Sequence, residues 1–125
     1  KTPACGWAAG IERIILVLKN SNISVPDIKS EPKIFVAQLG EAGKRKGLSL
    51  FENLREENIK AISSLGRDSI KSQLRIANRL GVKFTLIIGQ KEALDGTVIL
   101  RDMESGIQET LPTKNIVDIL KKRIK

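Results

Sequence analysis

A continuous apolar run at residues 84–88, Phe-Thr-Leu-Ile-Ile, predicts a strand that is buried on both faces. Such a strand needs helices on both sides of its sheet, and the flanking sequence alternates between strand-like and helix-like segments. The expected strands lie at 34–39, 60–65, 83–88, 97–102 and 107–111, and the expected helices lie at 41–57, between Asp68 and Gly81, and after Thr113. This order predicts an α/β sandwich in which a mixed five-stranded sheet is flanked by three helices.

Short local signals mark where these elements end and which side chains face inward. Asp68 is expected to cap the helix that follows it, Gly81 to close that helix, and Thr113 to cap the last helix. A turn at 104–106, Glu-Ser-Gly, joins the last two strands into a hairpin. The side chains expected to face inward are Leu50, Phe51, Leu54, Ile70, Leu74, Ala77, Ile116, Leu120 and Ile124.

The N-terminal part of the chain has a different organisation. Apolar residues at helical spacing predict a helix at 8–19, entered from a strand through a glycine-containing junction. Residues 21–32 are rich in serine, asparagine and charge and contain Pro26 and Pro32, which indicates a linker. We therefore expect three parts: a strand–helix piece at 1–20, a linker at 21–32 and a domain at 33–125.

The positive charge of the chain is concentrated in this last domain. The formal net charge is +8, and residues 33–125 hold 18 basic and 11 acidic side chains. Such an excess suits a polyanionic partner. The few aromatic rings, at Trp7, Phe35, Phe51 and Phe84, argue against an RNA reader that stacks several bases on a sheet of exposed rings.

Several chemistries are excluded by residue types that are rare or missing. With one cysteine, Cys5, and no histidine, the chain cannot form an internal disulfide, and a zinc site or a Ser-His or Cys-His catalytic pair is not expected. The longest apolar run, 14–18, is too short to cross a bilayer, and no secretory signal is visible. A reducing, cytoplasmic setting without a membrane partner is expected.

Three segments in a fixed order resemble one family. Residues 6–18, Gly-Trp-Ala-Ala-Gly-Ile-Glu-Arg followed by Ile-Ile-Leu-Val-Leu, resemble motif 3 of class II aminoacyl-tRNA synthetases, in the version of the histidyl-tRNA synthetases. Residues 66–81 resemble the second helix of that family's C-terminal anticodon-binding domain, and residues 87–92 and 96–102 resemble its third and fourth strands with their connection. Together they cover essentially the whole chain, which makes the signal more specific than one glycine-rich match.

The resemblance implies the C-terminal portion of a larger ligase, with an N-terminal helix from the catalytic core and then the anticodon-binding domain. The parent enzyme would use ATP to activate histidine, attach it to its tRNA and act as a homodimer, with Mg²⁺ held upstream. Gly6, Gly10 and Arg13 would contribute to the ATP site, and Arg13 would act catalytically on the departing pyrophosphate. This chain alone would be inactive and hold no metal. The alternative is that the glycines only allow a helix to pack on a strand and that Arg13 is a solvated cation.

Four basic residues recur every four positions on the predicted second domain helix, at Arg67, Lys71, Arg75 and Arg79. Residues four apart share one helix face, so this stripe can follow a phosphate backbone. Arg67, Lys71 and Arg75 are the stronger tRNA-binding candidates because Arg67 stands at the helix start, where backbone amides favour anions. A merely solvated helix face remains the alternative.

Glu92 and Arg101 are the candidates for reading anticodon bases, because the resemblance matches them to base-contacting positions of related domains. A carboxylate accepts from exocyclic amines, and a guanidinium can pair with two acceptors on a base edge. The alternative is a glutamate in a turn and a strand arginine paired with an acid such as Glu109.

Other functions remain open beside the ligase. Residues 39–47 follow a strand and open a helix, but they lack the Gly-Lys-Ser/Thr ending of a phosphate loop, so a tight turn and a basic helix are favoured. A catalytically silent synthetase paralogue with a regulatory or stress-sensing role is one rival, and a small-molecule-binding domain of flavodoxin-like architecture is another.

Overall fold

The computed structural model describes residues 2–23, 33–64, 66 and 69–124. The chain divides into two compact units, Lys1–Ser30 and Glu31–Lys125, which are considered separately below. Most of the predicted linker at 21–32, together with Arg67 and Asp68, lies outside the described residues.

The described residues of the first unit form one helix, α1 (Ile11–Asn20). It begins three residues later than predicted, after Gly10, whose extended φ of −83° marks the boundary. Residues 2–10 form neither helix nor strand here, so the strand expected before the helix, within a larger catalytic core, stays a prediction. A strand needs a neighbour for its backbone groups, and the described residues offer it none. None of the α1 residues is buried, and Ile11 is 68% exposed.

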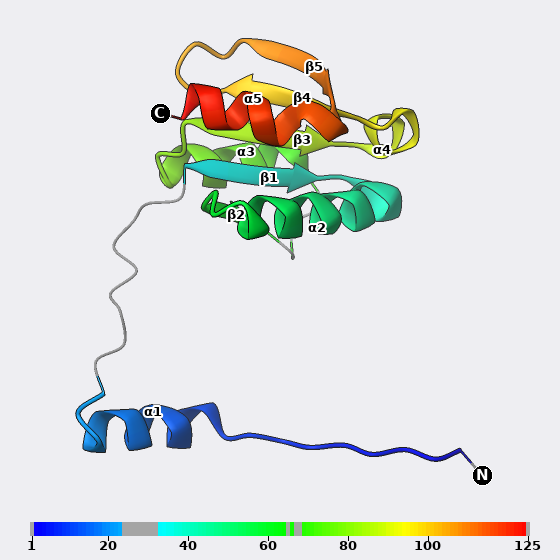
Figure 1. The fold of residues 1–125 in the computed structure, drawn as a ribbon. Coiled ribbons are helices and arrows are strands. Elements are labelled where there is room, and N and C mark those ends of the chain that lie inside the picture. Colours follow the sequence, from blue (N-terminus) through cyan, green and yellow to red (C-terminus); the bar gives the residue numbers. More distant parts are fainter. Residues whose placement is uncertain (1, 24–32, 65, 67–68, 125) are drawn as a thin grey trace. The chain divides into compact units, whose positions relative to one another are not determined.

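The second unit is built on the predicted mixed five-stranded sheet (Figure 1). Its strands are β1 (Ile34–Gln38), β2 (Ala61–Ser63), β3 (Phe84–Ile88), β4 (Thr97–Asp102) and β5 (Gln108–Pro112). Their order is β2-β1-β3-β4-β5, with β1 parallel to β2 and β3, and with β4 antiparallel to β3 and β5. The fold class predicted from the sequence is therefore confirmed.

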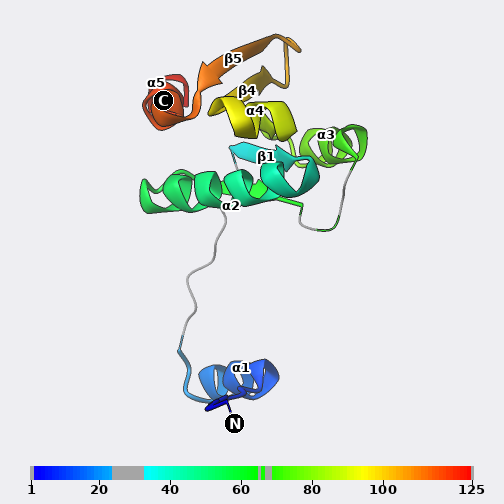
Figure 2. The ribbon, with the colours of Figure 1, turned by 90° about the vertical axis from the view of Figure 1, so that its right-hand side faces the viewer.

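The three predicted flanking helices cover the two faces of this sheet unequally. The helices α2 (Gly40–Glu56) and α5 (Ile116–Arg123) lie on one side, and α3 (Ile70–Arg79) lies on the other (Figure 2). Residues 90–95, expected to be a connection, instead form an additional short helix, α4 (Gln90–Asp95). This helix ends at Gly96, whose backbone is in the left-handed region. The prediction that Thr113 caps the last helix is wrong, because Thr113 begins a 3₁₀ turn (Thr113–Asn115) and makes no capping hydrogen bond with its side chain.

Two apolar clusters fill the space on either side of the sheet. Alternate residues of β1 separate them: Ile34 and Val36 face α2 and α5, whereas Phe35 and Ala37 face α3. The α2 side is the larger core and includes the predicted Leu50, Leu54, Ile116 and Leu120. Phe84, Leu86 and Ile88 also lie on that side, and Thr85 is fully buried on the other. The strand at 84–88 is thus covered on both faces, as its composition predicts.

Gly43 allows α2 to lie unusually close to the sheet. A Cβ atom at this position would stand 2.6 Å from the carbonyl oxygen of Ile88, which belongs to the backbone of β3 and cannot rotate away. We expect Gly43→Ala to lower the free energy of unfolding by about 1–3 kcal/mol, because overpacking displaces the helix. The direction of the change is informative because alanine is more favourable than glycine in a helix interior by about 1 kcal/mol, so helix propensity alone would raise the stability.

Urea unfolding monitored by far-UV circular dichroism measures this effect. Gly66→Ala is the matched control, because a Cβ there would meet nothing within 4 Å and the backbone is outside the left-handed region. An unchanged or raised stability of Gly43→Ala would show that the helix can move without cost.

Candidate functional site

The outer face of α3 carries a row of exposed cations. Lys71, Arg75 and Arg79 are exposed, whereas Gln73 and Ala77 are buried against the sheet. The row follows from spacing alone, because residues four apart lie one turn above each other on the same helix face. Three of the four members of the predicted stripe are therefore together on one accessible surface, and Arg67 lies outside the described residues.

Gln73 fixes α3 to the end of β1 through a pair of buried hydrogen bonds. The backbone N–H of Gln38 donates to Gln73 Oε1 at 3.0 Å, and Gln73 Nε2 donates to the carbonyl oxygen of Gln38 at 2.7 Å. Gln38 pairs with Ile88 of β3 on one side, but on the other side β2 ends at Ser63, opposite Val36, so none of the described strands continues beside Gln38 there. The amide of Gln73 takes the place of the missing strand neighbour and satisfies both backbone groups.

Sequence reasoning missed the role of Gln73, although one signal was present. A glutamine stands within the predicted apolar stripe, three residues after Ile70 and four before Ala77. A polar residue at a core-facing position needs hydrogen-bond partners. That requirement pointed to a buried polar contact, but not to its partner.

Arg101 lies on the same side of the sheet as α3. Its strand partners are Thr85 on β3 and Gln108 on β5. Thr85 faces the α3 side, where its hydroxyl donates a hydrogen bond to the sulfur of Met103. The Arg101 side chain is half-buried, and its Nε is fully buried without a hydrogen-bond partner among the described residues. This arrangement leaves a guanidinium with a buried donor that the described residues do not satisfy.

The alternative partner considered for Arg101 is used elsewhere. Glu109 is opposite Leu100, so its side chain faces the α5 side of the sheet, away from Arg101. There Arg123 binds it with two hydrogen bonds, NH1 to Oε1 at 3.3 Å and NH2 to Oε2 at 3.0 Å. The pairing of Arg101 with Glu109 is therefore wrong, because the two residues belong to opposite faces.

The turn that follows Arg101 is held by Asp102. Its carboxylate Oδ1 accepts hydrogen bonds from the backbone N–H groups of Ser105 and Glu104, both at 2.9 Å. These bonds favour the charged form, and the one from Ser105 contributes most to a lowered pKa of Asp102. The hairpin end beside Arg101 is thereby fixed by an ionised side chain.

Glu92 lies on a different part of the domain from Arg101. It is the third residue of α4, and its Oε2 accepts a hydrogen bond at 3.0 Å from the backbone N–H of Gly89, which caps the helix. Glu92 also lines a cavity of about 260 Å³ together with Lys46 of α2 and Val117 of α5. The structure does not bring Glu92 together with Arg101, since one lies toward α2 and α5 and the other toward α3.

The candidates in the first unit stand alone. Arg13 is exposed on the first turn of α1, and the side chain of Arg13 passes over Gly10, whose Cβ would lie 3.7 Å from that of Arg13. A Cβ at Gly6 would meet nothing within 4 Å, so no contact with the described residues of this unit requires a glycine there. Close approach of a ligand is one reason for glycine at such a position. Open backbone and an accessible guanidinium are features that a nucleotide phosphate can use.

Two further features, a metal-binding cluster and a membrane-spanning helix, are absent from the described residues. No group of three or more histidine, cysteine, aspartate or glutamate side chains is arranged to hold a metal ion in that part of the chain. Among its helices, none combines the length and apolar character needed to span a bilayer.

Comparison with known proteins points in one direction. Residues 33–123 match the family model described as the anticodon binding domain. A histidine–tRNA ligase of Dehalococcoides mccartyi is 41% identical over 98% of this chain and 29% of its own length, and one of Pyrococcus furiosus is 36% identical over 99% of this chain and 28% of its own. The chain therefore spans less than a third of these relatives.

Solved structures give the same result for the fold. Apo histidyl-tRNA synthetase from S. aureus superposes with a TM-score of 0.68 and 32% identity over 89% of this chain and 28% of that one. The RNA binding domain of threonyl-tRNA synthetase from Cryptosporidium parvum superposes with a TM-score of 0.69 over 85% of this chain and 27% of that one; at 20% identity it supports the fold alone.

Proposed function

The chain belongs to the anticodon binding domain family, and from this premise we propose that its second unit binds the anticodon stem-loop of a tRNA through α3 and the sheet surface beside it. The observation that carries the proposal is the exposed row of Lys71, Arg75 and Arg79 on a helix that Gln73 anchors to the sheet. A row of cations on a rigid helix suits the regular spacing of phosphates along an RNA backbone.

Affinity and selectivity have different sources in this proposal. Lys71 and Arg75 provide contacts to phosphates, which position the RNA without reading its sequence. Arg101 provides selectivity, because its half-buried side chain can present guanidinium donors to a base edge. For Glu92, the capping bond to Gly89 accounts for one carboxylate oxygen, which leaves the other for a ligand on the α4 side.

The larger protein, in this proposal, is a histidine–tRNA ligase that attaches histidine to its tRNA in an ATP-dependent reaction. The names of the most similar relatives support it and do not favour a silent regulatory paralogue. Arg13 and Gly10, with the open backbone at Gly6, would provide one edge of the ATP site, where the Arg13 cation would hold phosphate oxygens. The homodimer and the cytoplasmic location expected from the resemblance belong to this proposal as well.

Arg101→Ala tests the reading of the anticodon. Loss of a bidentate base contact costs about 1–3 kcal/mol, so we expect the affinity for tRNA(His) to fall by about tenfold while the affinity for an unrelated tRNA stays the same. Fluorescence anisotropy of labelled tRNA at fixed salt measures both. The matched control is Arg55→Ala, an exposed arginine of α2 that pairs with Glu52 at 2.8 Å. Equal losses of affinity for both tRNAs would show that Arg101 contacts a phosphate and does not read a base.

A further inference from the structure

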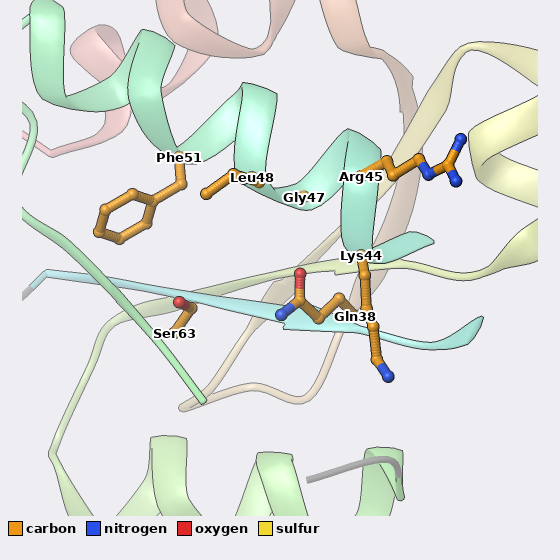
Figure 3. Close-up of a pocket in the computed structure, with 7 residues that line it drawn as sticks. All are labelled: Gln38, Lys44, Arg45, Gly47, Leu48, Phe51 and Ser63. Atoms are coloured by element: carbon orange, nitrogen blue, oxygen red, sulfur yellow. The ribbon is translucent and has the colours of Figure 1, made fainter. Parts of the chain in front are cut away.

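A small cavity lies between α2 and the ends of β1 and β2, on the opposite side of the sheet from α3 (Figure 3). Its volume is about 220 Å³. Gln38 and Ser63 line it from the sheet, and Gly47, Leu48 and Phe51 line it from α2. The cavity is smaller than the about 300–1,000 Å³ typical of sites for drug-sized ligands, so it suits one small group.

The cavity exists because β2 stops early. Ser63 is the last residue of β2 and pairs with Val36, so β1 continues to Gln38 without a strand on that side. The backbone of Gln38 is bound by Gln73 from the far side, and its side chain turns toward α2. Gly47 provides the room, since a Cβ there would stand 2.6 Å from Gln38 Oε1.

The walls and the floor of the cavity differ in chemistry. Leu48, which is 57% exposed, and the ring of Phe51 form an apolar wall on α2. The Gln38 amide and the Ser63 hydroxyl form a polar floor, and an amide presents a donor and an acceptor side by side. A flat apolar ring with a hydrogen-bonding edge matches both surfaces, and a nucleobase is such a group. An apolar peptide side chain would leave the amide edge buried without a partner, which is costly.

The cavity and the basic row of α3 lie on opposite sides of the sheet, and the end of β1 lies between them. Gln73 lies between Lys71 and Arg75 and touches the backbone of Gln38, whose side chain lines the cavity. The end of β1 therefore contacts both the inner face of α3 and the cavity. Arg45 stands at the rim as an exposed residue, with its guanidinium directed away from Gln38 (Figure 3).

We infer that this cavity receives one unpaired base of the bound RNA, stacked on Phe51 and Leu48 and hydrogen-bonded by Gln38 and Ser63. The inference rests on the proposed function, because it takes the RNA on α3 as the source of the base. It adds a second contact of a different kind, which no charge on α3 can provide.

A double-mutant cycle tests the inference with the full 125-residue chain. The probes are 17-nucleotide anticodon stem-loops, either intact or with one loop nucleotide made abasic in turn. Stacking is worth about 1–3 kcal/mol per base, so Gln38→Leu and Leu48→Ser are each expected to weaken binding of the intact loop by about five- to tenfold. At the loop position whose base enters the cavity, removing the base should weaken binding by the wild-type protein by the same factor. The variants should bind that abasic loop as tightly as they bind the intact loop.

A control variant and the possible outcomes separate this test from the test of the proposed function. Leu48→Ser changes an exposed residue and leaves the core intact, and Leu94→Ser, an exposed leucine of α4, is its matched control. No base enters the cavity if both Gln38→Leu and Leu48→Ser bind all loops as the wild-type protein does. The same conclusion follows if, at every abasic position, the loss of affinity from the substitution multiplies the loss from removing the base. In either case the binding on α3 still stands. If the wild-type protein binds no stem-loop at all, the proposed function itself fails.

Discussion

Gln73→Leu is expected to lower the free energy of unfolding of the second unit by about 2–4 kcal/mol, because it leaves the N–H and C=O of Gln38 buried without partners at about 1–3 kcal/mol each. Leucine is apolar and similar in volume to glutamine, so the change removes the two hydrogen bonds at 3.0 and 2.7 Å without opening a large void. Chemical unfolding followed by far-UV circular dichroism measures the effect. Trp7 fluorescence does not serve, because Trp7 belongs to the first unit and is exposed.

The control for this substitution is Gln90→Leu, which makes the same chemical change at an exposed position at the start of α4. We expect it to change stability by less than about 0.5 kcal/mol, as most surface substitutions do. If Gln73→Leu were as stable as the control, the amide of Gln73 would not be the strand substitute that the geometry shows. The attachment of α3 would then depend on its apolar residues alone.

Reversing two charges on α3, Lys71→Glu with Arg75→Glu, is expected to weaken tRNA binding by more than about tenfold at about 100 mM salt. Each lost phosphate contact releases about one counterion fewer, so the slope of log affinity against log salt should become shallower by about two units. Both side chains are exposed on the outer face of α3, so the fold is expected to survive the change. Anisotropy titrations at several salt concentrations measure the affinity and the slope together.

The control makes the same change of net charge elsewhere on the domain. Lys60→Glu with Lys122→Glu reverses two exposed lysines, one before β2 and one on α5. We expect the control to keep most of the affinity, with only the weak loss that a lower net charge brings at this salt. Equal losses in the two double variants would mean that the general positive charge, and not the α3 row, holds the RNA.

Much of the architecture could be predicted because the apolar patterns are unambiguous. The run at 84–88 favours a strand covered on both faces, and the spacing of Leu50 and Leu54 favours the inner face of a helix; the structure confirms both. The six residues of α4 carried no such signal, because a helix of fewer than two turns shows no period. Thr113 has the composition of a cap, but the chain enters α5 through a 3₁₀ turn that leaves its side chain unused.

The candidate site was predictable only where one helix contains all of its members. Lys71, Arg75 and Arg79 share a face by spacing alone, so no tertiary information was needed to place them together. The positions of Arg101 and Glu109 depend on the register of β4 with β5, in which a shift by one residue exchanges the two faces of a strand. The cavity beside Gln38 depends on where β2 ends and on the room left by Gly47, and neither is visible in a pattern of residue types.

The central claim, that α3 and the sheet surface beside it hold the RNA, is tested most directly by NMR with the ¹⁵N-labelled chain and a 17-nucleotide anticodon stem-loop of tRNA(His). The account predicts that the largest shifts of backbone amide signals occur in α3 around Lys71 and Arg75 and on β4 at Arg101. Shifts confined to α5 and the outer end of α2, with the signals of α3 unchanged, would contradict it.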